Sequence, residues 1–334
     1  MSTRIIALAV VPFAALFSGA TWAQTQARAA PAAPDASFTV PRTPWGDADL
    51  QGVWDYRTIT PLERRPELGD RELYSDEEIA ELEGRAAARL DQPPDAETPA
   101  NLVHAQYMTD PGRYVDESRR TSLIVDPPNG RIPALTPEAE ERQAQARGAG
   151  APARTGGRAD SWLDRTLMER CITRGLPGAL LPGLYNNNIR ITQAPGVVAI
   201  VHEMVHETRV VPLDGSEFSG TGGYMGESRG HWEEDTLVIE TRNFNGKIAF
   251  RGSGANLRLT ERYTRVGPDT IDFRLTFEDE TQWTQPWTVA YLMRTAEGEL
   301  YEYACHEGNY GLRNILENAR AEEKAAAEAA ATQN

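Results

Sequence analysis

The sequence has few lysines and cysteines, and it has no long apolar run after its N-terminal region. Lys247 and Lys324 are the only lysines among 334 residues, so a Schiff-base or lysine-base mechanism has little material. Beyond the N-terminal region no stretch of about 18 residues is apolar, and the sequence predicts no integral membrane segment there. The formal net charge of −15 would repel phosphates, which argues against nucleic-acid and anionic-membrane partners.

The N-terminus has the pattern of a secretory signal peptide. Arg4 precedes an apolar run over residues 5–17 that is too short to span a bilayer, and Thr21-Trp22-Ala23 places small residues where signal peptidase cleaves. We expect a signal peptide over residues 1–23 and a flexible, Ala/Pro-rich leader over residues 24–43. The pattern predicts a periplasmic or secreted protein, which we expect to be a monomer.

Cys171 and Cys305 are the only cysteines. In an exported chain, such a pair predicts a single disulfide bond. A bond that closes so long a loop would stabilise the fold by about 4 kcal/mol through its effect on the unfolded chain. Two buried thiols and a catalytic thiol are the alternatives.

The second half of the chain has the pattern of antiparallel β-structure. Seven strands are expected, at residues 188–194, 197–211, 231–241, 256–266, 270–278, 286–294 and 299–304. Successive strands at this spacing predict a mainly β fold with peripheral helices, in which an antiparallel meander closes into a lipocalin-like barrel. The expected divisions are an N-terminal arm of loops and helices over 44–160, the β domain over 161–317 and an Ala/Glu-rich tail over 318–334.

Two helices are expected in the N-terminal arm. Ser75 and Glu78 form the pattern of a capping box, and the helix that they begin should end near Arg89. Thr136 followed by Pro137 is the typical start of a second helix. Residues 91–115 are rich in Pro and Asp without periodicity, which predicts a surface loop.

The segment His202-Glu203-Met204-Val205-His206 matches the H-E-x-x-H pattern of zinc metalloproteases, which requires a helix. Eight of the fifteen residues from 197 to 211 are β-branched, and turn residues flank the segment, which favours a strand. In a strand, His202 and His206 would lie roughly 13 Å apart, too far for one zinc ion. We expect no metal and no cofactor. The alternative, with His202 and His206 as zinc ligands on a helix, stays open because the apolar period fits both structures.

Strand alternation divides the polar residues of this segment between two faces. One face would carry His202, Met204, His206 and Thr208, and the other Glu203, Val205, Glu207 and Arg209. His206 is the preferred acid or base, because an imidazole titrates near neutral pH, and in a catalytic site Glu203 or Glu307 would lie close enough to orient an imidazole. The alternative is a ladder of ion pairs with the neighbouring strands.

Further candidates lie around the second cysteine and in the β region. His306 and Glu307 follow Cys305, in a loop that a disulfide would hold in place, and they are candidates for proton transfer. We expect five residues to contact the substrate: Arg209, Asn188, Trp283, Trp287 and Tyr310. Asparagines also stabilise turns and tryptophan pairs also fill cores, so structural roles are the alternatives.

Several longer motifs carry a family resemblance. Residues 226–238, GESRGHWEEDTLV, are similar to a G-D-S-R-G-x-W-E-G-D-T-L-V signature, with Glu227 for Asp and Glu234 for Gly. PWGDADLQGVW at 44–54, DPPNGR at 126–131 and YEYACHEGNY at 301–310 resemble its other blocks. The chain thus resembles a large family of secreted bacterial proteins of unassigned function, which implies no activity. Gly52-Val53-Trp54 also resembles the Gly-x-Trp that opens lipocalin barrels.

The sequence therefore favours a secreted enzyme that uses His and Glu for acid–base chemistry on a small neutral organic molecule, a carbohydrate or an aromatic compound. Elimination, isomerisation and hydrolysis are the candidate reactions. The alternatives are a non-catalytic, lipocalin-like binder of a small ligand and a zinc-dependent hydrolase through His202 and His206.

Overall fold

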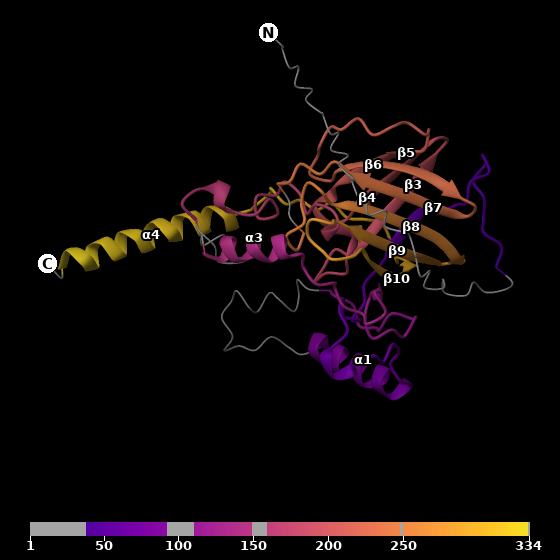
Figure 1. The fold of residues 1–334 in the computed structure, drawn as a ribbon, viewed down its shortest axis with the longest axis horizontal. Coiled ribbons are helices and arrows are strands. Elements are labelled where there is room, and N and C mark those ends of the chain that lie inside the picture. The colour runs from indigo at the N-terminus through magenta and orange to yellow at the C-terminus, as the bar shows by residue number, and fades with distance from the viewer. Residues whose placement is uncertain (1–37, 92–109, 149–158, 248–249, 333–334) are drawn as a thin grey trace, which may run out of the picture.

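The protein folds as one antiparallel sheet that curls into a nearly closed barrel (Figure 1). The structure, a computed structural model, describes residues 38–91, 110–148, 159–247 and 250–332, so the predicted signal peptide lies outside the described residues. The strands are β1 (Gly52–Asp55), β2 (Ile124–Asp126), β3 (Asn188–Ala194), β4 (Val197–His202), β5 (Thr208–Pro212), β6 (Glu227–Glu233), β7 (Thr236–Arg242), β8 (Arg258–Gly267), β9 (Thr270–Glu278) and β10 (Trp287–Thr295). Hydrogen bonds join them in the order β5-β4-β3-β1-β10-β9-β8-β7-β6, and β2 pairs with β10 beside this path. The predicted mainly β, barrel-like fold is confirmed.

Tight turns join many of the neighbouring strands where the sequence lets the backbone reverse. Gly196, with φ of 77°, lies between β3 and β4, and Glu234, with φ of 54°, lies between β6 and β7. Residues 268–269 separate β8 from β9, between the strands predicted at 256–266 and 270–278. Alternation along each strand then turns every second side chain inward, so that Glu261 and Tyr263 of β8 are both buried.

Aromatic side chains from β9, β10 and the segment between them fill one part of the core. The Phe277 ring stacks on Trp287, with ring centroids 3.8 Å apart, and Trp283 packs edge-on against Trp287 at 5.5 Å. The two tryptophans are 2% and 0% exposed. Burial of such a ring contributes roughly 2–3 kcal/mol through removal of apolar surface from water. Trp283 and Trp287, predicted to contact the substrate, lie inside the core, where a ligand in solvent does not reach them.

The barrel closes at a seam between β5 and β6, and side chains rather than a strand ladder make this closure. Throughout the described chain, these two strands exchange no backbone hydrogen bonds. Gly230 of β6 lies so close to the β5 side that a Cβ atom there would come within 2.6 Å of Leu213 and 3.0 Å of Val211. Arg209 of β5 reaches across the seam and donates to Ser228 Oγ at 3.3 Å.

The signature segment at 226–238 thus has a structural role at this seam. Glu227 accepts hydrogen bonds from the backbone N–H groups of Ser219 and Gly220, at 2.7 and 3.1 Å, and from Asn243. The backbone N–H of Ser219 contributes most to lowering the pKa of Glu227, which falls to about 2. Glu227 therefore holds the long connection between β5 and β6 as a carboxylate at neutral pH.

Helices lie outside the barrel (Figure 1). They are α1 (Asp76–Asp91), α3 (Pro137–Gly148) and α4 (Gly311–Thr332). Short 3-10 helices also occur, of which η3 contributes the buried Ala179 and Leu180 to the core: η1 (Pro66–Leu68), η2 (Trp162–Asp164), η3 (Gly178–Leu180) and η4 (Met204–His206). The predicted capping box of α1 is present, because Ser75 N donates to Glu78 at 2.8 Å and Glu78 N donates to Ser75 at 3.3 Å. Thr136 caps α3, as predicted. The C-terminal helix α4 projects away from the barrel, and no helix of the described chain is long and apolar enough to cross a membrane.

Three predicted strands differ from the structure. The prediction of one strand over 197–211 is wrong. These residues form a hairpin of β4 and β5, and the turn of this hairpin contains η4. The strand predicted over 231–241 likewise divides at a turn into parts of β6 and β7, and residues 299–304 do not form a strand. The turn within 197–211 needs Val205 and His206 in the left-handed region, with φ of 61° and 54°. Residues other than glycine rarely adopt the left-handed conformation, and β-branched residues such as Val205 favour extended backbone. Tertiary contacts must therefore hold the turn in place.

Candidate functional site

A buried polar network occupies the inside of the barrel. Arg209 donates two hydrogen bonds to the Glu261 carboxylate, at 2.8 and 2.7 Å, and the side chains are 4% and 0% exposed. Tyr263 donates to the same carboxylate at 2.8 Å, and Ser228 is hydrogen-bonded to Thr241 at 2.8 Å. Arg209, predicted to contact the substrate, is therefore committed to a buried ion pair.

His202 belongs to this network and is fully buried. Arg209 Nε donates to His202 Nε2 at 3.3 Å, so the His202 Nδ1 atom carries the proton and donates to the Ala179 carbonyl at 3.2 Å. Burial, with the nearby Arg209 charge, lowers the pKa of His202 to about 3. His202 is thus a neutral structural residue near pH 7.

The helix that the zinc alternative requires is absent, because His202 ends β4 whereas His206 lies in the turn after it. Both ring nitrogens of His202 already have protein partners. In the described ranges of the chain, no three His, Cys, Asp or Glu residues gather in a way that could hold a metal ion. The geometry therefore offers no support for a zinc site at His202 and His206.

The turn between β4 and β5 brings two of the predicted site residues together. Glu203 accepts hydrogen bonds from the backbone N–H of Asn188 at 3.1 Å and from its side-chain amide at 2.8 Å. His206 occupies the same turn, and its side chain is exposed. Glu203 and Asn188 thus fasten the turn to the start of β3, which gives both a structural role.

Glu207 is a residue of this turn that the sequence analysis did not single out. Its carboxylate accepts from the backbone N–H of Arg174 at 3.0 Å. Burial raises the pKa of Glu207, and hydrogen bonds from Thr173 and from the Arg174 and Gly175 backbone oppose that rise. Its position in a run of alternating polar and apolar residues gave no sign of this contact, which depends on a segment 33 residues away.

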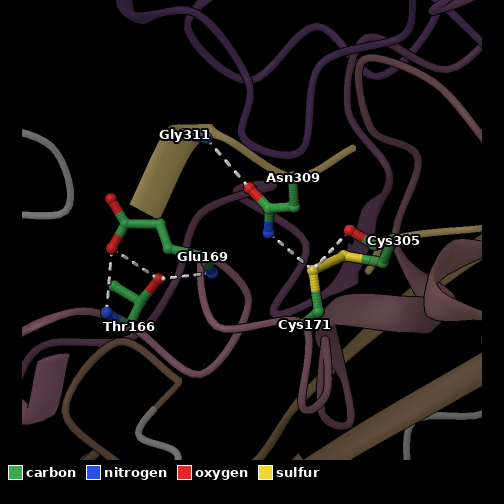
Figure 2. The surroundings of a disulfide bond; sticks show 6 residues. All are labelled: Thr166, Glu169, Cys171, Cys305, Asn309 and Gly311. Carbon is green, nitrogen blue, oxygen red and sulfur yellow. Dashed lines mark hydrogen bonds between the residues drawn. A yellow bond between two sulfur atoms is a disulfide. The ribbon is translucent and has the colours of Figure 1, made fainter. Parts of the chain in front are cut away.

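The predicted disulfide is confirmed and anchors the C-terminal segment to the barrel (Figure 2). It joins Cys171 and Cys305 across a sequence separation of 134 residues. Asn309 lies beside it: the side-chain amide donates to Cys171 Sγ at 3.0 Å, and Asn309 Oδ1 accepts from the backbone N–H of Gly311 at 3.1 Å, where α4 begins. The bond and Asn309 together fix the start of α4.

The remaining predicted residues of this segment face solvent. His306 and Glu307 are exposed, and Tyr310 is 66% exposed. Neither His306 nor His206 lines the cavity described below. The acid–base role that the sequence assigned to them stays a prediction.

A cavity of about 320 Å³ lies in the outer wall of the barrel, at a gap in the sheet. We call it the wall groove; it is lined by Asp55, Arg57, Asp110, Gly112, Arg113, Tyr114, Val115, Asp116, Glu117, Leu292 and Arg294. Pairing between β1 and β10 extends to Arg294, and pairing between β2 and β10 begins at Val289. Between them, the carboxylate of the buried Asp116 accepts from the backbone N–H of Leu292 at 2.8 Å, in place of a strand carbonyl. The gap exists because β1 and β2 cover different parts of the same strand edge.

Three arginines and four carboxylates line the wall groove. Arg57 is paired with Asp55, at 2.6 Å, and with Asp110, and the hydrogen bond to Asp55 is the main cause that raises the pKa of Arg57. Arg294 Nη2 is paired with Glu117, whose side chain is 60% exposed, and Arg294 Nη1 contacts Asp269 at 3.3 Å and donates to Thr270 Oγ1. Burial lowers the pKa of Arg294 below its usual value, although the charge of Asp116 opposes this. The groove therefore presents a partly desolvated guanidinium whose two carboxylate partners, Glu117 and Asp269, are 60% and 64% exposed.

None of the predicted site residues lines the wall groove. Residues 91–115 are predicted as a surface loop, of which 92–109 lie outside the described residues, and no sequence pattern marked Asp116 or Arg294 as a site residue. A dense run of charged and aromatic residues at 110–117 was the available signal.

Comparisons of the chain with protein-family models, with curated proteins and with solved structures find no match. The resemblance to secreted bacterial proteins stays a prediction.

Proposed function

We propose that the protein binds a small organic acid in the wall groove, with the ligand carboxylate on Arg294. The observation that carries this proposal is the pairing of a partly buried Arg294 with the highly exposed Glu117 beside a cavity. An exposed ion pair contributes only about 0–1 kcal/mol, so a ligand carboxylate displaces Glu117 at little cost. The Nη2 atom that Glu117 leaves then donates a charge-assisted hydrogen bond to the ligand carboxylate, while Nη1 keeps its contacts with Asp269 and Thr270.

The size and lining of the groove restrict the ligand further. A volume of about 320 Å³ is at the lower end of the range for small-molecule sites, which favours a ligand of one ring or a short chain. Leu292 and Val115 supply apolar surface, and the 67% exposed Tyr114 offers a ring face at the rim. The ligand class is therefore a monocyclic carboxylate, aromatic or sugar-derived.

Inside the barrel, the described side chains that point inward contact one another, and the wall groove lies outside this packing. This arrangement favours binding on the outer wall over a lipocalin-like ligand in the barrel interior. A predicted signal sequence and the disulfide support a periplasmic or secreted location, where the protein acts as a monomer without a cofactor. The acid–base enzyme remains the alternative, and binding without turnover of the ligand is the result that separates the two.

Isothermal titration of the mature protein with benzoate and with glucuronate tests this proposal. Arg294→Gln removes the guanidinium that binds the ligand carboxylate. We therefore expect the affinity for both carboxylates to fall by about 10–100-fold, which corresponds to the loss of a charge-assisted hydrogen bond. Arg262→Gln is the matched control, because Arg262 pairs with the exposed Glu233 on another part of the barrel. Equal affinity of wild type and Arg294→Gln for these carboxylates, or no binding by the wild type, would exclude the proposed site.

A further inference from the structure

Arg64 is a buried arginine without an acidic partner. The residue is only 3% exposed. Its Nε atom donates to Thr121 Oγ1 at 2.9 Å, whereas Nη1 is buried and has no hydrogen-bond partner. No Asp or Glu in the described parts of the chain forms a salt bridge with this guanidinium.

The acidic residues nearest in the sequence and along the neighbouring segment are engaged elsewhere. Glu63 pairs with Arg251 at 3.7 Å, and Glu72 pairs with Arg120 at 3.8 Å. A guanidinium in a protein carries a positive charge. Burial of an unpaired charge destabilises a fold even after the surroundings relax. The fold thus contains a positive charge whose counter-charge the described chain does not supply.

The surroundings hold Arg64 in one position. Arg64 N donates to the Gly130 carbonyl at 2.8 Å, and a Cβ atom at Gly130 would lie 3.0 Å from Arg64 Cβ and 3.1 Å from Nε. Glycine at 130, with φ of 69°, therefore lets the turn at 127–131 press against the arginine. Thr121 Oγ1 donates its own proton to the Arg71 carbonyl at 2.7 Å, which directs an oxygen lone pair towards Arg64 Nε.

One atom of the guanidinium remains for a ligand. Nη2 makes no hydrogen bond within the described chain, and it is not among the fully buried atoms, so solvent reaches it. We propose that this end of Arg64 binds a small oxyanion, a phosphate or carboxylate group, which accepts from Nη2 and supplies the missing negative charge. This site is separate from the wall groove, where both Arg57 and Arg294 already have carboxylate partners.

Thermal unfolding of the mature protein in chloride buffer at constant ionic strength tests this site, with sodium phosphate titrated in one series and sodium acetate in another. An anion that binds only the folded state raises the unfolding temperature in a saturable way. We expect Arg64→Gln to weaken the response at least about tenfold, because a charge-assisted hydrogen bond is lost. Arg65→Gln is the matched control: its side chain is exposed, and it should respond as the wild type does.

Each outcome decides the proposal. A saturable response to phosphate alone identifies a phosphoryl group, and responses to both anions identify a general oxyanion site. The proposal is overturned if neither anion gives a saturable response in the wild type, or if Arg64→Gln responds as strongly as the wild type. Should Arg64→Gln not fold, wild-type crystals soaked in sodium selenate provide a second measurement. An anomalous peak beside Nη2 supports the site, and a featureless map at Nη2 refutes it.

Discussion

Disruption of the Arg209–Glu261 pair should destabilise the barrel far more than disruption of any exposed pair. The pair is joined by hydrogen bonds of 2.8 and 2.7 Å, and its side chains are 4% and 0% exposed. In Arg209→Met, the Glu261 carboxylate keeps only the Tyr263 hydroxyl, at 2.8 Å, among its donors. A buried charge deprived of its partner costs about 3–5 kcal/mol, so the folded-to-unfolded ratio should fall on the order of a thousandfold.

Urea unfolding followed by tryptophan fluorescence measures this loss as a change in the free energy of unfolding. Arg262→Gln is the control: Arg262 adjoins Glu261 on β8, but its 2.7 Å pair with Glu233 is exposed, and its loss should cost about 0–1 kcal/mol. The double variant Arg209→Met/Glu261→Gln should lose less than the sum of its single variants, because no unpaired charge remains. If Arg209→Met costs no more than the control, the reasoning is refuted.

Two further predictions concern pH and the disulfide. Stability should decrease as pH falls below 6.5, because burial and Arg209 lower the pKa of His202 to about 3, and between these values the unfolded chain binds a proton that the folded protein does not. Free energies of unfolding between pH 7 and 4 check this, and an equally steep decrease in His202→Gln would contradict it. Separately, Cys171→Ser should lower the free energy of unfolding by about 3–5 kcal/mol, because the bond closes a loop of 134 residues. Thermal unfolding of the wild type with and without reductant measures the same effect, and equal midpoints with fully reduced thiols would argue against it.

Sequence patterns predicted the elements whose formation depends on neighbours in the chain. Ser75 with Glu78 and Thr136 with Pro137 identified the starts of two helices, because a cap is a contact over three residues. The series of strand segments separated by turn residues after residue 187 identified the fold class. The disulfide was predictable because the sequence predicts export, and Cys171 and Cys305 leave one possible intramolecular pair.

Tertiary structure decided the course of the chain at residues 203–207. The β-branched residues around His202 favour a continuous strand, yet contacts of Glu203 with Asn188 and of Glu207 with Arg174 fold this segment into a turn. The turn places His202 and Arg209 together inside the barrel, whereas a continuous strand would have placed them on opposite faces. Local preference is worth up to about 1 kcal/mol per residue, and several tertiary contacts together exceed it.

The sequence determined that this is a mainly β chain with a disulfide and helices at its periphery, since composition, periodicity and caps act locally. Only the tertiary structure decided where its sites lie. The wall groove arises because β1 and β2 cover separate parts of the β10 edge, and the charge of Arg64 is unpaired because nearby acids pair elsewhere. Such features depend on which distant segments meet, and the spacing of residues along one chain does not contain that information.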